Sequence, residues 1–440
     1  MKISLNKKTW NRAKQLIPNG TMLLSKNPDV FLPSYWPTYF SKAKGCHVWD
    51  LENNKYLDFS LMGVGTNILG YSHSKVNKAV IKAIKNGNMS TLNCKEEVDL
   101  GNELIKIHPW AKMVRFARTG GEANSIAIRI ARSSLPKKKY KIAFCGYHGW
   151  HDWYLASNIK NQNKLENFLM KGIRSKGVPD ELKNSIIPFY YNDVESLKKI
   201  LSKNKDIGII ILEPYKDSGP KKNFLKKVRE IATKNKIILI FDECTTGFRN
   251  VYGGIHLKYK INPDLAMFGK ALGNGHAITA VIGKKNIMKN TNQSFISSTF
   301  WTERSGPAAA LATLKEMKRI KSWNKINRIG SYVKKNIIKI AKKNNLEINL
   351  SGYDGLIKFN FPKKNNLYCK TYLTQEMLEN NILATNAIYI SIEHKLKYIR
   401  KYLNILEKVF FIISSKKSNE DIRKLIHGKI CKSDFRSIIR

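Results

Sequence analysis

The sequence predicts an α/β protein with a largely parallel sheet, and three observations support this class. Apolar runs that are too short for buried helices alternate with stretches of helical spacing between residues 61 and 305. Several of these runs are apolar throughout, which is typical of strands that helices cover on both faces. Polar residues and glycines follow where the runs end, and ligands of such sheets bind beyond the carboxyl ends of the strands.

The strands and helices of this region follow from apolar spacing and from the turns between the runs. We expect strands at Val114–Ala117, Lys141–Cys145, Ile207–Leu212, Ile237–Phe241, Leu265–Phe268 and Ile278–Ile282. We expect helices at Glu122–Arg132 and at about Asn223–Lys234.

Three segments are predicted. Residues 1–60 form an N-terminal arm and a small-domain segment, with a helix at Thr9–Ile17 and a hairpin within Gly45–Phe59. Residues 61–305 form a large domain, and residues 306–440 form a C-terminal small domain. The elements expected in the C-terminal domain are helices at Pro307–Arg319, Trp323–Asn344 and Thr371–Asn380 and a strand at Leu356–Phe361.

Composition indicates a globular protein, since 42% of the 440 residues are hydrophobic. No apolar stretch approaches the roughly 18 residues of a membrane span, and the first twenty or so residues lack the apolar core of a signal peptide. We therefore expect no membrane association. The cysteines are scattered without a CxxC pair, which favours a reducing compartment such as the cytoplasm and predicts no metal framework.

The net charge is extreme, at +45 from 78 basic and 33 acidic residues. One interpretation is a scaffold that binds nucleic acid. The other is a lysine-rich composition on solvated faces, and the spread of the lysine pairs along the whole chain favours it. We therefore expect no nucleic-acid partner, although the charge favours anionic small molecules.

Asp242 and Lys270 are the strongest candidates for chemistry. Asp242 ends a buried apolar run, where a carboxylate is costly unless a positive group meets it. Lys270 follows Phe268-Gly269 and precedes Gly273 and Gly275, where the backbone can approach a ligand closely. An acid and an amine at neighbouring strand ends suit pyridoxal 5'-phosphate (PLP). The lysine would form a Schiff base, and the acid would hold the ring nitrogen protonated.

Two glycine-containing turns at strand ends are further candidates. Thr119-Gly120-Gly121 lies between a strand and a helix, where free N–H groups bind phosphate, although such a turn is often only a turn. In Tyr147-His148-Gly149 the tyrosine could stack on a flat ring. A metal site at His148, His151 and Asp152 and a structural histidine pair remain as alternatives.

Two weaker candidates have ordinary alternatives. Glu213 ends the run Ile207–Leu212 and could hydrogen-bond a ring, or it could be a surface strand end. The segment Ser297–Phe300 could offer hydroxyls to a phosphate, or it could be a polar turn.

Together these stretches resemble the class III aminotransferases, and most closely the branch that contains glutamate-1-semialdehyde aminomutase. The resemblance extends from about Arg12 to Phe410 and is carried by five motifs in the family's order: TGGEA, YHG, EP, DECTTGFR and GKALGNG. It implies PLP as the cofactor and the PLP-dependent transferase fold of type I, with a mostly parallel seven-stranded sheet in the large domain and a smaller α/β C-terminal domain.

The resemblance also implies a role for each candidate. Gly120 and Gly121 would bind the PLP phosphate with Thr119 beside them, Tyr147 and Cys244 would lie on opposite faces of the ring, and His148 would belong to the same site. Glu213 and Asp242 would lie at the ring edge, and Lys270 would carry the cofactor. Thr299 would reach the phosphate of the neighbouring subunit, so the active unit would be a homodimer.

The sequence departs from the family mainly on the substrate side. Lys26 stands near the place of the aminomutase's arginine for the substrate carboxylate, and a lysine is a point charge rather than a fork. The leading hypothesis is an aminotransferase that moves an amino group to the aldehyde or keto group of a small, anionic or sugar-like acceptor. The alternatives are glutamate-1-semialdehyde 2,1-aminomutase and, more distantly, the nucleic-acid-binding scaffold.

Overall fold

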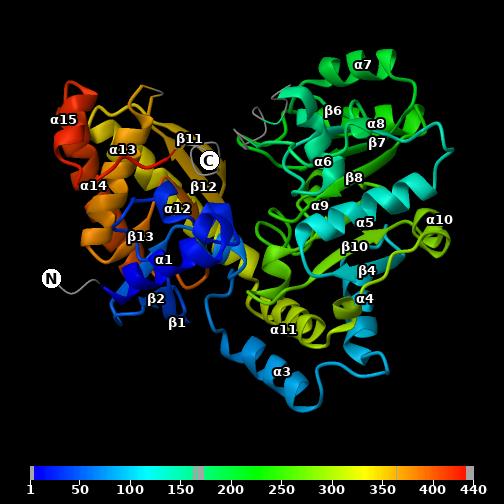
Figure 1. Ribbon diagram of the computed structural model, residues 1–440, viewed down its shortest axis with the longest axis horizontal. Coiled ribbons are helices and arrows are strands. Elements are labelled where there is room, and N and C mark those ends of the chain that lie inside the picture. The colour runs from blue at the N-terminus through cyan, green and yellow to red at the C-terminus, as the bar shows by residue number, and fades with distance from the viewer. Residues whose placement is uncertain (1–3, 162–164, 166–172, 363, 433–440) are drawn as a thin grey trace. The chain divides into compact units, whose positions relative to one another are not determined.

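The computed structural model describes residues 4–161, 165, 173–362 and 364–432. The chain divides into two compact units (Figure 1). Unit 1 comprises residues 1–73 and 325–440, and unit 2 comprises residues 74–324. The division into segments at residues 60 and 305 stays a prediction, since the units are compact groups of residues rather than independently folding domains.

A seven-stranded sheet forms the centre of unit 2, in the order β4-β10-β9-β8-β7-β5-β6. All neighbouring strands are parallel except for β10, which is antiparallel to both β4 and β9. The strands are β4 (Met113–Ala117), β5 (Lys141–Cys145), β6 (Ile186–Pro188), β7 (Ile207–Leu212), β8 (Ile238–Asp242), β9 (Leu265–Phe268) and β10 (Thr279–Gly283). The predicted α/β class and the mostly parallel sheet are confirmed.

The central strands are apolar because helices cover both faces of the sheet. Every residue of β7, β8 and β9 is buried, as expected for parallel strands. Figure 1 shows α5 lying across the sheet, and α5 contacts β7, β8, β9 and β10. The helices of unit 2 are α3 (Ser74–Lys85), α4 (Lys95–Ile107), α5 (Gly120–Ser133), α6 (Asp152–Leu155), α7 (Val194–Lys203), α8 (Phe224–Lys234), α9 (His256–Tyr259), α10 (Lys285–Met288) and α11 (Ser305–Ile320).

Unit 1 contains two smaller sheets. One has the order β1-β2-β3-β13, in which the antiparallel pair of β2 and β3 is the predicted hairpin. The other has the order β11-β12-β14. The strands are β1 (Phe40–Lys44), β2 (His47–Asp50), β3 (Lys55–Phe59), β11 (Asn349–Tyr353), β12 (Leu356–Asn360), β13 (Ile382–Ala384) and β14 (Ala387–Tyr389).

Further helices come before, between and after these strands along the chain. They are α1 (Leu5–Leu16), α2 (Met62–Gly65), α12 (Ser322–Lys343), α13 (Asn366–Glu379), α14 (Leu396–Ser415) and α15 (Asn419–Lys424). Helix α1 begins earlier than predicted because the Ser4 side chain accepts a hydrogen bond from the N–H of Lys7 and caps the helix.

Candidate active site

The carboxyl ends of the parallel strands bring the predicted residues of unit 2 to one edge of the sheet. Asp242 is the last residue of β8, and Lys270 follows β9, its parallel neighbour. Glu213 follows β7, and the YHG segment follows β5, both of which run parallel to β8. The topology therefore places a carboxylate and an amine side by side at the edge where such sheets bind ligands.

Asp242 is buried and its carboxylate accepts three hydrogen bonds. Oδ2 accepts from His148 Nδ1 at 2.8 Å and from Asn124 Nδ2 at 2.9 Å. Oδ1 accepts from the N–H of Cys244 at 3.0 Å. A buried carboxylate is stable only when hydrogen bonds or opposite charges meet it, and these three donors supply that stabilisation for Asp242.

His148 is buried, and its ring forms a hydrogen bond with Asp242. A carboxylate oxygen only accepts, so Nδ1 carries a proton, while Nε2 has no hydrogen-bond partner among the described residues. Phe144, Trp153 and Tyr154 surround the ring. Within the described residues no group of three His, Cys, Asp or Glu could hold a metal ion.

Glu213 and Tyr147 are joined at the ends of β7 and β5. Oε2 of Glu213 accepts a hydrogen bond from the N–H of Tyr147 at 3.1 Å. Burial raises the pKa of the Glu213 carboxyl, and the charge of Asp242 raises it further. Gly146 has a φ of +117°, and a Cβ there would lie 2.6 Å from Glu213 Oε2, so only glycine allows this contact.

The Tyr147 side chain is 36% exposed, which makes it the accessible aromatic face of the site. Burial raises the pKa of its phenol, while the positive charge of Lys270 lowers it. The Tyr147 phenol is therefore close enough to Lys270 for its pKa to respond to the charge of the amine. This is expected of an aromatic residue that stacks on a ring held by that lysine.

Lys270 has a left-handed backbone, with a φ of 43°. A non-glycine residue in this region costs about 1–2 kcal/mol, and such strain is concentrated at functional sites. Its Nζ donates a hydrogen bond to Thr245 Oγ1 at 2.7 Å. Thr245 was not identified from the sequence, because only the fold brings it to the lysine.

Cys244 lies between two glycines that the sequence singled out. A Cβ on Gly120 would lie 3.1 Å from Cys244 Sγ, and a Cβ on Gly269 would lie 2.9 Å from it. Burial raises the pKa of the Cys244 thiol to about 11, although Lys270 lowers it. The thiol is therefore neutral near pH 7 and offers an uncharged packing surface.

Helix α5 begins with a capping box. The Thr119 hydroxyl accepts from the N–H of Glu122 at 3.4 Å, and the Glu122 carboxylate accepts from the N–H of Thr119 at 2.7 Å. Gly120 and Gly121 take the first two helical positions, whose N–H groups have no partner inside a helix. A phosphate would thus meet these two N–H groups, while the Thr119 hydroxyl is engaged in capping.

Thr299 begins a short 3-10 helix, Thr299–Thr302, and is exposed. Neighbouring residues tie this segment to the start of α5. Trp301 Nε1 donates to Glu122 Oε1 at 3.2 Å, and Arg118 pairs with Glu303 at 3.2 Å. The segment is therefore anchored to the glycine turn, and Thr299 itself is left on the surface.

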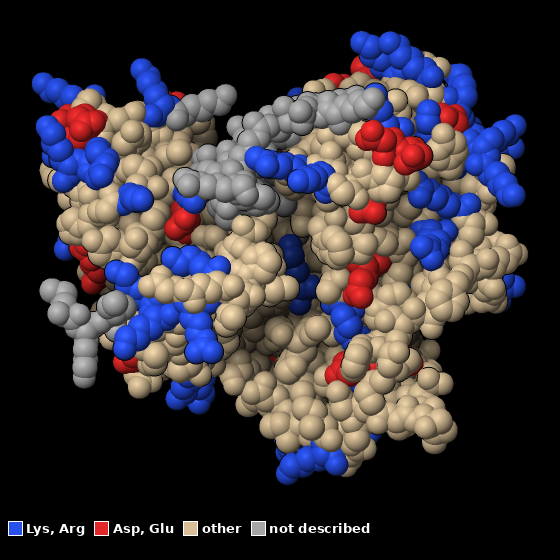
Figure 2. All heavy atoms as spheres, in the orientation of Figure 1, with Lys and Arg blue, Asp and Glu red and all other residues tan. Residues whose placement is uncertain are grey.

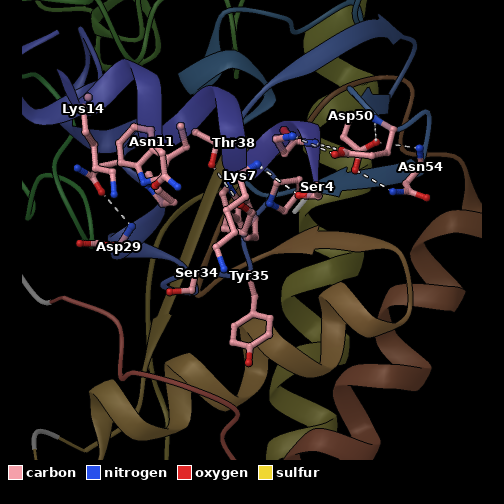
Figure 3. A pocket seen from close by; sticks show the side chains of 18 of the residues that line it. Ser4, Lys7, Asn11, Lys14, Asp29, Ser34, Tyr35, Thr38, Asp50 and Asn54 are labelled. Carbon is pink, nitrogen blue, oxygen red and sulfur yellow. Dashed lines mark hydrogen bonds between the residues drawn. The ribbon is translucent and has the colours of Figure 1, made fainter. Parts of the chain in front are cut away.

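Lys26 belongs to unit 1, where it ends the 3-10 turn Leu24–Lys26 and is exposed. A pocket of about 560 Å³ lies beside α1 in the same unit (Figure 3). Its lining includes Lys7, Asn11 and Lys14 on one side and Asp50 on the hairpin. None of the residues predicted to bind cofactor or substrate lines this pocket.

The residues of unit 2 fit PLP. The glycine turn offers N–H groups for a phosphate, Asp242 offers a carboxylate for a ring nitrogen, and Lys270 offers an amine for an aldehyde. Gly120 and Gly269 leave space beside Cys244 that a Cβ would fill.

Comparison with known proteins agrees with this chemistry. A family model described as aminotransferase class-III matches residues 33–391. The chain is 35% identical to 3-aminobutyryl-CoA aminotransferase of Cloacimonas acidaminovorans over 393 residues, which cover 86% of this chain and 90% of that protein. It is 31% identical to glutamate-1-semialdehyde 2,1-aminomutase of Methanosphaera stadtmanae over 430 residues, covering 92% and 98%.

Solved structures share the fold at lower identity. The PLP internal aldimine form of the FumI protein of Sphingopyxis sp. MTA144 matches with a TM-score of 0.83 at 20% identity, covering 95% of this chain and 99% of that chain. An omega-transaminase from Sphaerobacter thermophilus matches with a TM-score of 0.82 at 20% identity, covering 96% and 98%. Among the described residues, no helix is long and apolar enough to cross a membrane.

Proposed function

Because the chain belongs to the class III aminotransferases, which use PLP, we propose that it transfers an amino group from a small donor to the aldehyde or keto group of a small acceptor. The proposal rests on the positions of Asp242 and Lys270 at neighbouring strand ends on one edge of the sheet. Asp242 ends β8 and Lys270 follows the adjacent parallel strand β9, and three hydrogen bonds hold the carboxylate of Asp242 in place.

When bound, PLP supplies an aldehyde for amino groups and a ring that spreads charge from the neighbouring carbon. Asp242 would hold a proton on the ring nitrogen, and His148 and Asn124 fix its carboxylate in place. Lys270 would hold the cofactor through its amine and, when free, would move a proton with Thr245 Oγ1 as its hydrogen-bond partner. Gly120 and Gly121 would hold the phosphate through their N–H groups.

The aromatic and acidic neighbours complete the proposed site. Tyr147 would lie on one face of the ring and Cys244 on the other, and Glu213 accepts a hydrogen bond that orients the Tyr147 backbone. The raised pKa of Glu213 allows its carboxyl to take up a proton more readily than an exposed glutamate. Glu213 can therefore act as a hydrogen-bond donor or acceptor at the ring edge.

The acceptor is proposed by class only. A small anionic or sugar-like carbonyl compound fits the +45 charge of the chain. The relatives act on a coenzyme A thioester and on glutamate-1-semialdehyde, as their names state, so both compounds belong in the substrate panel. We propose that Lys26 binds an acidic group of the substrate. A cytoplasmic location stays a prediction.

Intramolecular transfer, as in a glutamate-1-semialdehyde aminomutase, is the second candidate. The chain aligns with several such enzymes over more than four-fifths of the length of each. Supplying the semialdehyde without an amino donor separates the two. An aminomutase makes 5-aminolevulinate unaided, whereas a transaminase needs a second amino compound.

The central experiment converts the enzyme to its pyridoxamine phosphate form and mixes it with aldehydes, keto acids, keto sugars and 3-oxoacyl thioesters. Recovery of the PLP spectrum with one class identifies the acceptor. An enzyme that binds PLP but shows no recovery with any carbonyl compound and no aminomutase activity would refute the proposed function.

We also propose a homodimer in which Thr299 serves the neighbouring subunit. Thr299 is exposed while Trp301 and Glu303 are anchored beside it, as expected for a residue presented to another chain. Sedimentation should show a dimer, and Thr299→Ala should weaken PLP binding without dissociating the dimer. A monomer with full activity would contradict this arrangement.

A further inference from the structure

A second concave site lies on the flank of α5, beside the glycine turn proposed to bind the PLP phosphate. The pocket has a volume of about 490 Å³, which is in the range of small-molecule sites. Figure 1 shows α5 and α6 side by side in unit 2, and the pocket lies between α5 and the segment that leads into α6. Its lining consists of Ser125, Ile128, Arg129, Arg132, Trp150, His151, Asp152 and Trp153.

Two arginines of α5 give the pocket its charge. Arg129 and Arg132 are three residues apart and therefore lie on the same helix face. Arg129 Nη1 donates to the Phe295 carbonyl at 2.9 Å, and Arg132 Nε donates to the Tyr140 carbonyl at 3.1 Å. These carbonyls orient the guanidinium groups, and each group has five N–H donors, so donors remain for a ligand.

Neither arginine forms an ion pair with a carboxylate of the described residues. Arg132 is half-buried, and burial lowers the pKa of its guanidinium. A partly desolvated charge without an opposite charge is unfavourable, and an anion would relieve that cost. Asp152 is the single acidic residue of the lining and is exposed, so the positive charge prevails. Figure 2 shows basic side chains over the end of α5.

Aromatic side chains form the other part of the pocket. Trp150 is 68% exposed and stacks on His151, with the ring centroids 4.4 Å apart and the planes inclined by 26°. Trp153 Nε1 donates to Ser125 Oγ at 3.0 Å and so fixes this wall to α5. His151 Nδ1 is buried and has no hydrogen-bond partner among the described residues. One face of an indole is therefore accessible close to two arginines.

We propose that this pocket binds a small molecule that carries a phosphate group on an aromatic framework, as a nucleoside monophosphate does. The guanidinium forks of Arg129 and Arg132 bind the phosphate, because planar forks match its oxygens. Trp150 stacks on the flat ring of the ligand. The site adjoins the glycine turn, since a Cβ on Gly121 would lie 2.7 Å from His151 Cε1, but none of the residues proposed to bind PLP lines it. The proposal does not depend on the proposed reaction.

The test is a binding measurement on the holoenzyme, dialysed free of excess PLP, by calorimetry and tryptophan fluorescence. The probe is adenosine 5'-monophosphate, with adenosine and inorganic phosphate as partial ligands. The monophosphate should bind at least about tenfold more tightly than either partial ligand, since phosphate and ring each contribute. Equal affinities for monophosphate and adenosine, or no binding of the monophosphate, would overturn the proposal.

Paired variants locate the site. Arg129→Gln/Arg132→Gln should weaken binding of the monophosphate about tenfold or more. The control Arg12→Gln/Arg328→Gln removes the same charge from exposed positions outside the pocket and should change binding less than about twofold. Equal losses in both pairs would show general electrostatic attraction and refute the site. Arg129→Gln alone, at an exposed position, replaces the double variant should the latter not fold.

Discussion

The Nδ1 atom of His148 lies 2.8 Å from Oδ2 of Asp242, and both side chains are inside the protein. The imidazole is enclosed by Phe144, Trp153 and Tyr154, so water cannot easily replace it. In the proposed function, His148 is therefore a positioning residue that holds the carboxylate of Asp242 in its orientation.

His148→Ala should slow the first half-reaction about 10- to 100-fold, because a hydrogen bond to a charged group contributes roughly 1.5–3 kcal/mol. Stopped-flow spectra of the conversion of PLP to pyridoxamine phosphate would measure this. His427→Ala, which removes a mostly exposed histidine in unit 1, is the control and should not change the rate. A half-reaction at the wild-type rate in His148→Ala would show that Asp242 does not need this donor.

Lys270→Ala should abolish the near-visible absorbance of lysine-bound PLP while leaving the protein folded. The reason is that the proposed covalent link requires the amine of this residue, whose Nζ is held by Thr245. Absorbance spectra after gel filtration with added PLP would measure the loss. The exposed Lys285 provides a control, since Lys285→Ala should keep the full spectrum. An unchanged spectrum in Lys270→Ala would assign the link to another lysine.

Much of the sheet could be predicted because its strands are apolar on both faces. The predicted bounds of β5, β7 and β9 agree with the structure, and β8 begins and ends one residue later than predicted. The three-residue strands β6, β13 and β14 were missed, since runs this short carry no periodic signal.

The residues of the candidate site were also predicted only in part. Asp242 and Lys270 were recognised because charged residues interrupt apolar runs there, and the structure brings them to adjacent strands. Asn124 and Thr245 were not recognised, although they hydrogen-bond to these two residues. Both are ordinary polar residues in their local sequence. Their hydrogen bonds to Asp242 and Lys270 join residues more than twenty positions apart in the chain, so only the folded structure identifies them.

Thr119→Ala should destabilise the protein by about 1 kcal/mol, because the hydroxyl caps α5 by accepting from the N–H of Glu122. Urea unfolding of the apoprotein would measure this cost. Thr119→Ser keeps the oxygen and should retain the stability. PLP titration of both variants then separates capping from cofactor binding. A loss of PLP affinity without a loss of apoprotein stability would mean that the hydroxyl binds the phosphate instead of capping the helix.

His108 should make the stability of unit 2 depend on pH. Its Nδ1 donates to the Leu104 carbonyl and its Nε2 accepts from the N–H of Gly254, both at 2.9 Å, so the ring is neutral. Burial, with a smaller contribution from His256, lowers the pKa of His108 to about 4. A proton on Nε2 would break the bond to Gly254 and leave a charge in the interior.

The unfolded chain takes up a proton at His108 near pH 6.5, whereas the folded protein does so only near pH 4. The stability contributed by the neutral ring is therefore complete above pH 6.5 and is lost as the pH falls towards 4, by about 3 kcal/mol in total. Urea unfolding at pH 7, 6, 5 and 4.5 would measure the decline. His108→Gln, which has no titrating group there, should be less stable at pH 7 but show a shallower decline. Parallel pH curves for the two proteins would exclude His108 as the source.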